Sequence, residues 1–350
     1  MSLYGLVRPA IFTRTRKDPE VAHEKMLRLL QWVAQRDYAM RILEQVYRVN
    51  GLDEAVEHLG IKFPNRIGVS AGLDKNGEIV RQFAAMGWGF EEVGTVLPRP
   101  QAGRDRPRLF RLEEYEALIN RMGFNSSGAR RVRINLESAN LPSLAMRVGI
   151  SIGMMKETPL ERAHEDYCAV LRILAMYGDY LVVNVSSPNT PELRRLLTLT
   201  YIRDLVRRVV MAERGAAGIY RRLPPRPVLV KLSPDSSQEE IGATVEASLE
   251  GGARGFIASN TTTNKSSVEK HLHGQEVGGL SGDPLFYNNL VLIKTVRRYA
   301  PTALLIASGG INSGRRANAA MQSGADLIQV YTGLVYRGPG LIKELRRAVV

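Results

Sequence analysis

The sequence has 350 residues, 44% of them hydrophobic and 24% charged, which is typical of one large globular domain or two smaller ones. The only cysteine is Cys168, which excludes an intramolecular disulfide and a multi-cysteine metal site, and without an HExxH motif we expect no metal. The net charge of +13 suits anionic substrates or an anionic membrane, whereas scattered basic residues disfavour nucleic acid. No apolar run could span a bilayer, and no signal-peptide core is present.

The first 50 residues predict an amphipathic helical hairpin. Residues 1–17 carry basic and no acidic side chains, and Asp18 with Pro19 marks a helix start. Apolar residues then repeat at helical spacing over 22–33 and again over 39–47. Two uses stay open: the apolar faces pack on the main domain, or they lie on a membrane and admit an apolar ligand.

From Arg66 onward, short apolar strands alternate with helices, which predicts a single (β/α)8 barrel, with domain bounds 51–350. The expected strands are Arg66–Ala71, Phe90–Val96, Ala145–Ile152, Tyr180–Val185, Pro227–Leu232, Gly255–Ser259, Ala303–Ala307 and Leu327–Tyr331. The expected helices are Glu78–Met86, Ala129–Ser138, Leu160–Met176, Tyr201–Glu213, Gln238–Glu250, Leu285–Tyr299, Gly314–Ser323 and Leu341–Val349. Residues 214–227 are expected to form a surface loop.

Every expected strand ends in polar or glycine residues, which predicts an active site at the carboxyl end of the barrel. Lys75 and Lys231 lie at two of these ends, and Lys231 follows apolar residues, so we expect it to be buried and paired. The glycine-rich ends of the last two strands are typical of a phosphate site. Because the chain has no GxGxxG motif, FMN is a better candidate cofactor than a dinucleotide.

Residues 98–125 form a connection longer than a usual βα loop. Such an insertion at a barrel mouth serves as a lid or substrate clamp, or it is a plain surface β-hairpin. Both interpretations stay open at this point.

Ten motifs in chain order resemble the dihydroorotate dehydrogenases, and the N-terminal hairpin resembles the extension of the membrane-associated, quinone-dependent class 2. The motifs include AGLDKNGE (71–78), RPRLFRL (106–112), INRMGFN (119–125), NVSSPNTP (184–191), VKLSPD (230–235), GGLSG (278–282) and QVYTGLVY (329–336). The resemblance implies oxidation of (S)-dihydroorotate to orotate in pyrimidine biosynthesis. It implies FMN as the hydride acceptor, a membrane quinone as the final acceptor, and a peripheral enzyme on the cytoplasmic side of the cell membrane.

The resemblance also implies roles for individual residues. Ser187 falls on the catalytic base, which takes the C5 proton of dihydroorotate, with Thr190 as its candidate proton partner. The implied FMN contacts are Ala71, Gly72, Leu73, Asp74, Lys75, Thr95, Ser151, Asn184, Lys231, Ser259, Gly282, Gly310, Tyr331 and Thr332. The implied substrate contacts are Lys75, Asn120, Arg121, Met122, Gly123, Phe124, Asn184, Asn189, Asn260 and Thr261. The implied quinone route passes His23, Arg111 and Tyr331.

Two departures from the family pattern put one contact in question. Ser151 stands where the family usually has asparagine, and Met154-Met155 stands for Lys-Asn, so the hydrogen bond assigned to residue 151 is in doubt. Three alternatives remain: a class 1-type or other FMN barrel with a soluble acceptor, a non-redox barrel for a phosphorylated ligand, and a basic scaffold protein.

Overall fold

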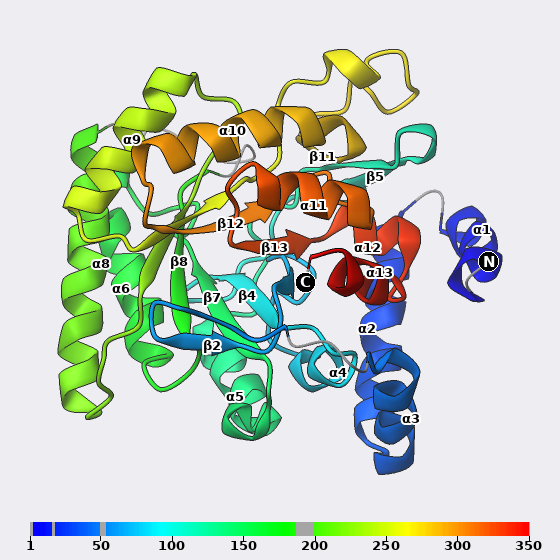
Figure 1. The fold of residues 1–350 in the computed structure, drawn as a ribbon, viewed down its shortest axis with the longest axis horizontal. Coiled ribbons are helices and arrows are strands. Elements are labelled where there is room, and N and C mark those ends of the chain that lie inside the picture. The colour runs from blue at the N-terminus through cyan, green and yellow to red at the C-terminus, as the bar shows by residue number, and fades with distance from the viewer. Residues whose placement is uncertain (1–2, 16–17, 50–53, 187–198, 350) are drawn as a thin grey trace.

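The computed structural model describes residues 3–15, 18–49, 54–186 and 199–349, and its centre is a closed barrel of parallel strands ringed by helices (Figure 1). Consecutive barrel strands are neighbours, and the last closes onto the first. The strands are β3 (Ile67–Val69), β4 (Phe90–Val96), β7 (Arg147–Ile152), β8 (Tyr180–Asn184), β9 (Val228–Lys231), β10 (Gly255–Ala258), β12 (Leu304–Ser308) and β13 (Leu327–Val330). The (β/α)8 prediction is therefore confirmed.

The helices of the ring follow the predicted order. They are α4 (Val80–Ala85), α5 (Ala129–Ala139), α6 (Ala163–Ile173), α8 (Leu199–Ile219), α9 (Gln238–Glu250), α10 (Phe286–Tyr299), α11 (Gly314–Gln322) and α13 (Leu341–Ala348). The predicted surface loop over 214–227 is wrong in its first part, because α8 continues to Ile219. Ala216 and Ala217 are buried there, and this packing outweighs the low helix propensity of the two neighbouring glycines.

Two apolar layers hold the barrel together. The larger one lies between the strands and the surrounding helices, and the smaller one fills the barrel lumen. A hairpin of β1 (Val56–His58) and β2 (Ile61–Phe63) supplies Phe63 to the lumen. There its ring packs edge to face with Phe90, and the two ring centroids are 5.5 Å apart. The amino-terminal end of the barrel is thus packed with side chains, which leaves the opposite end for a site.

The insertion at the mouth forms a small antiparallel sheet. Its strands are β5 (Leu109–Leu112), β6 (Ala117–Asn120) and β11 (Gly279–Gly282), with β6 in the middle. The β-hairpin interpretation of residues 98–125 is confirmed for β5 and β6, and the sheet is extended by a strand from far along the chain. The sheet has its own apolar cluster, which includes Phe110 and Ile119.

The N-terminal residues form three helices: α1 (Leu3–Arg14), α2 (Glu20–Ala34) and α3 (Asp37–Tyr47). Helices α2 and α3 confirm the hairpin, and an oxygen of the Asp18 carboxylate accepts the Glu20 N–H at 3.0 Å as an N-terminal cap does. Helix α1 was not predicted; it packs against α12 (Thr332–Arg337), where Phe12 meets Tyr336 edge to face at 5.5 Å. Figure 1 shows α2 and α3 on the side of the barrel that carries α4 and α13.

Candidate active site

One cavity opens at the carboxyl ends of the barrel strands, below the β5–β6–β11 sheet. Most of the predicted contacts line it: Ala71, Gly72, Lys75, Thr95, Asn120, Met122, Gly123, Phe124, Asn184, Lys231, Ser259, Asn260, Thr261, Gly282, Gly310, Tyr331 and Thr332. The structure therefore brings together groups from residue 71 to residue 332. Leu73, Asp74, Ser151 and Arg121 do not line the cavity. Ser187, Asn189 and Thr190 lie outside the described residues.

Asp74 shapes the loop that presents Lys75. Its buried carboxylate accepts backbone N–H groups from Asn76, Glu78 and Ile79 at 3.2, 2.9 and 2.7 Å. Burial nevertheless raises the pKa of Asp74, and these hydrogen bonds oppose the rise. The loop over residues 74–79 is thus folded around one carboxylate, which fixes where Lys75 enters the cavity.

Lys75 is a cation whose charge is sensitive to pH. Desolvation lowers the pKa of Lys75 to about 8, while the charge of Glu20 on α2 opposes that change. At neutral pH the side chain is therefore mostly an ammonium group at the cavity wall. An ammonium there suits an anionic ligand.

Lys231 is buried and paired, as the sequence predicted. Its Nζ lies 3.4 Å from the Oε1 atom of Glu92, a residue that sequence reasoning did not select. The signal was available, because Glu91 and Glu92 interrupt an apolar strand that faces the core on both sides.

A chain of amides and hydroxyls crosses four strands beside the lysines. The Asn260 amide donates to Asn184 Oδ1 at 3.4 Å and to Ser186 Oγ at 3.1 Å, and the Asn184 amide donates to Thr95 Oγ1 at 2.7 Å. Thr95 and Ser151 share a hydrogen bond of 3.2 Å between their hydroxyls. The amide orientation of Asn184 is therefore fixed by its neighbours, and Ser151 lies behind Thr95.

The opposite wall is rich in glycine. Gly310 has a φ of +71°, and a Cβ there would lie 2.6 Å from the Phe286 backbone, so only glycine lets these segments approach. Thr332, whose hydroxyl shares a 2.8 Å hydrogen bond with Ser281, begins α12. N–H groups in a first helical turn have no intrahelical acceptor, so this wall fits a phosphate group.

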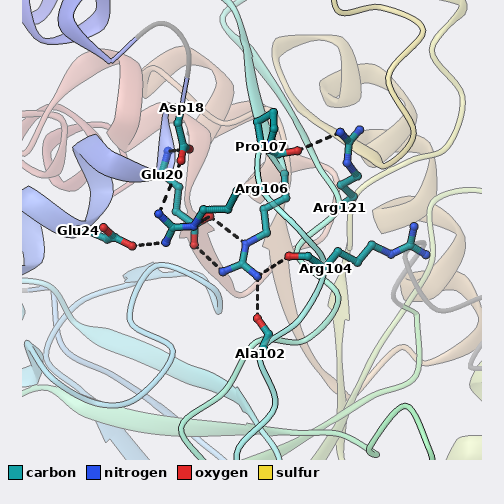
Figure 2. A network of polar contacts seen from close by, with 9 residues as sticks. Asp18, Glu20, Glu24, Ala102, Arg104, Arg106, Pro107 and Arg121 are labelled. Carbon is teal, nitrogen blue, oxygen red and sulfur yellow. Dashed lines mark hydrogen bonds and ion pairs between the residues drawn. The ribbon is translucent and has the colours of Figure 1, made fainter.

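Arg121 braces the small sheet from outside the cavity. Its guanidinium lies 2.6 Å from Glu276, donates to the Pro107 carbonyl at 2.9 Å and stacks over the Phe110 ring at 4.6 Å. Figure 2 shows the contact with Pro107. The cavity is lined by its neighbours Asn120, Met122, Gly123 and Phe124. Arg121 therefore supports this segment from outside, whereas the other four residues face the cavity.

An ion-pair cluster joins α2 to this sheet, and Figure 2 shows Arg106 among Asp18, Glu20 and Glu24. The buried pair is Glu20 with Arg108, which donates to both carboxylate oxygens at 2.9 and 2.8 Å. Burial favours neutral Glu20, but the hydrogen bonds and charge of Arg108 outweigh it and lower the pKa of Glu20. The hairpin is thus fixed to the rim of the cavity.

The predicted quinone-route residues come from different elements: His23 lies on α2 and Arg111 on β5, and of the three only Tyr331 lines the cavity. Desolvation and the charge of Lys75 lower the pKa of His23 to about 4, so His23 is neutral at neutral pH. Arg111 donates to Thr15 Oγ1 at 2.9 Å and lies over the Phe12 ring at 4.2 Å. The end of α1 therefore contacts Arg111 directly.

In the part of the chain that the structure describes, no group of three or more His, Cys, Asp or Glu side chains is arranged for a metal ion. None of the described helices combines the length and apolar character that crossing a bilayer requires.

The fold and cavity define a (β/α)8-barrel protein whose mouth carries lysines, amides and a glycine-rich wall, features that fit a phosphorylated cofactor with a polar ring. The family model described as dihydroorotate dehydrogenase matches residues 54–349. The chain belongs to the dihydroorotate dehydrogenase family.

Individual relatives agree with that family over nearly the whole chain. The chain is 40% identical over 344 residues to the dihydroorotate dehydrogenase (quinone) of Aliivibrio fischeri strain ES114, covering 98% of both chains. It is 41% identical over 346 residues to the enzyme of that name from Acidithiobacillus ferrooxidans, covering 98% of this chain and 93% of the relative. The crystal structure of Eimeria tenella DHODH in complex with ferulenol superposes with a TM-score of 0.84 at 31% identity, covering 98% and 93%.

Proposed function

We propose that this chain is a class 2 dihydroorotate dehydrogenase, which oxidises (S)-dihydroorotate to orotate in pyrimidine biosynthesis and reduces a membrane quinone. The observation that carries the proposal is the cavity itself. Two lysines and a fixed chain of amides converge there, in a barrel whose relatives over nearly the full length are named for this reaction.

FMN is the cofactor that the cavity fits. The glycine-rich wall around Gly310, Gly282 and Thr332 would take its phosphate, and Lys231, Asn184 and Thr95 would face its ring. When bound, FMN accepts the hydride and passes the electrons on. The remaining contacts from the sequence, such as Ala71, Ser259 and Tyr331, line the same cavity.

Ser151 has a different role from the asparagine that it replaces. Its hydroxyl bonds to Thr95 and the residue does not line the cavity. We assign it to holding Thr95, which in turn accepts the hydrogen bond from Asn184. Leu73 and Asp74 likewise belong to the loop that supports Lys75.

The substrate would lie between the amides and the small sheet. Asn184, Asn260 and Thr261 offer hydrogen bonds to the planar ring, Lys75 faces its carboxylate, and the 120–124 segment covers it. Ser187 takes the proton from C5, and Asn189 completes the polar contacts. Both of these roles rest on the sequence motif.

Residues 1–50 form the quinone and membrane module, and residues 51–350 form the barrel that binds FMN and substrate. The hairpin exposes large apolar side chains: Leu29, Trp32, Tyr38, Ile42 and Val46. This apolar area, together with the basic side chains of residues 1–17, favours an anionic membrane surface. We therefore propose a peripheral enzyme with His23, Arg111 and Tyr331 along the quinone path; its place on the cytoplasmic side rests on the family resemblance.

A comparison of electron acceptors tests this function. Purified protein is supplied with dihydroorotate and a long-chain quinone, fumarate or NAD, and orotate is followed by absorbance. We expect turnover with quinone and no comparable rate with the soluble acceptors. Cys168→Ser is the matched control for a class 1-type enzyme, which would use a cysteine as its base. Because Cys168 lies on α6 and does not line the cavity, this variant should keep its turnover. Turnover with fumarate or NAD, but not with the quinone, would contradict the proposal.

A further inference from the structure

Glu92 lies inside the barrel, one layer below the cavity. It pairs with Gly149 of β7, on the face of β4 that points into the lumen, and it is fully buried. Its Oε1 atom lies 3.4 Å from Lys231 Nζ, and its Oε2 atom accepts a hydrogen bond of 2.9 Å from the Gln329 amide. Lys231 and Gln329 line the cavity whereas Glu92 does not, so Glu92 reaches the cavity only through them.

The two buried charges depend on each other. Removing one partner of a buried ion pair leaves the other charge without compensation in a medium of low dielectric. Among the described residues, Glu92 is the one carboxylate within ion-pair distance of Lys231. Gln329 holds the second oxygen of Glu92, so the carboxylate has a fixed position from which to orient the ammonium group.

The adjacent Glu91 is a buried glutamate of the same strand that does not contact Lys231. It pairs with Val69 of β3 on the opposite face of the strand, and its two oxygens are buried without a hydrogen-bond partner. Burial, followed by the charge of Asp74, raises the pKa of Glu91 well above its usual value. Burial therefore favours the neutral form of Glu91, and glutamine is nearly isosteric with it.

We propose that Glu92 is a positioning residue for the flavin reaction: it holds the buried Lys231 side chain directed into the cavity, toward the flavin ring. This inference rests on the proposed function, because it requires FMN above Lys231. An ammonium there stabilises the negative charge that the ring gains on reduction, so Glu92 controls how readily the bound flavin is reduced.

The reduction potential of bound FMN tests the inference in Glu92→Gln, with Glu91→Gln as the matched control. Without the Glu92 carboxylate, the buried Lys231 side chain loses the partner that fixes its position, and its cation is no longer held toward the ring. We therefore expect the Glu92→Gln potential to shift to more negative values. Glu91→Gln should match wild type.

A Lys231→Met background separates positioning from simple structural support. If Glu92 acts through Lys231, adding Glu92→Gln to the Lys231→Met variant causes no further shift in potential. In the Glu92→Gln single variant, the affinity of the apoprotein for FMN, measured by fluorescence quenching, should fall. If Glu92→Gln alone fails to fold, the Glu92→Gln/Lys231→Met double variant should recover folding, because no unpaired charge remains.

Three outcomes overturn the inference: potentials equal to those of Glu91→Gln, a further shift from Glu92→Gln in the Lys231→Met background, or a double variant that still does not fold. A wild-type protein that binds no flavin would instead overturn the proposed function.

Discussion

Replacing Glu20 by glutamine should release the N-terminal hairpin from the barrel. Glu20 and Arg108 have side chains only 7% and 8% exposed and share two hydrogen bonds, so the pair is effectively buried. Losing one partner of a buried pair costs about 3–5 kcal/mol. Arg108 keeps its hydrogen bonds to the Ala102 and Arg104 carbonyls, so we expect the lower end, about 3 kcal/mol.

Glu24→Gln is the matched control for this change. Glu24 lies on the same helix and pairs with Arg106, but these side chains are 36% and 41% exposed. Exposed pairs contribute about 0–1 kcal/mol. Hydrogen exchange of the α2 and α3 amides measures the opening free energy, which should fall by about 3 kcal/mol in Glu20→Gln and by less than about 1 kcal/mol in Glu24→Gln.

The pH dependence supplies a second check on the same pair. Because the pKa of Glu20 is lower in the folded protein than its unfolded value of 4.5, its stabilisation is present above pH 4.5 and is lost as pH falls below that value. The difference between wild type and Glu20→Gln should therefore shrink in acid. Equal opening of the Glu20 and Glu24 variants, or a difference that grows in acid, would refute the reasoning.

Four further predictions concern the site. Ser187→Ala should remain yellow but reduce its flavin about 10²- to 10⁴-fold more slowly in stopped-flow mixing with dihydroorotate, and near-normal rates would remove Ser187 from the base role. Lys231→Ala should lower flavin occupancy or make its potential more negative; if both match wild type, Lys231 points elsewhere. Since the pKa of Lys75 is about 8, dihydroorotate affinity should weaken as pH rises through 8, and Lys75→Ala should abolish that dependence. Deleting residues 1–49 should preserve reduction of the flavin by dihydroorotate but abolish its reoxidation by a long-chain quinone, once flavin content has shown that the variant is folded. Full quinone activity would contradict the role of the hairpin.

Local patterns were sufficient to predict the barrel. Short apolar runs with polar ends identify its strands to within two residues at each end, because burial on both faces removes polar side chains from their interiors. The same ends identify the cavity, since parallel strands place their carboxyl ends together.

Features that depend on distant contacts were missed. Strand β11 reads as a glycine-rich loop until it pairs with β6, more than 150 residues earlier in the chain. Helix α1 owes its place to Phe12 against Tyr336, and the Glu20–Arg108 pair spans 88 residues. Charge alone does not tell which of many arginines pairs with a given glutamate. Glu92 was missed for the same reason, although its place in an apolar strand was visible.

The central claim is that electrons pass from dihydroorotate through a flavin in this cavity to a membrane quinone. One anaerobic experiment on the full-length protein tests it directly. Mixing with dihydroorotate should bleach the flavin absorbance and yield one orotate per flavin, and a long-chain quinone in anionic vesicles should then restore the colour. A flavin that dihydroorotate leaves oxidised, or one that only a soluble acceptor reoxidises, would contradict the account.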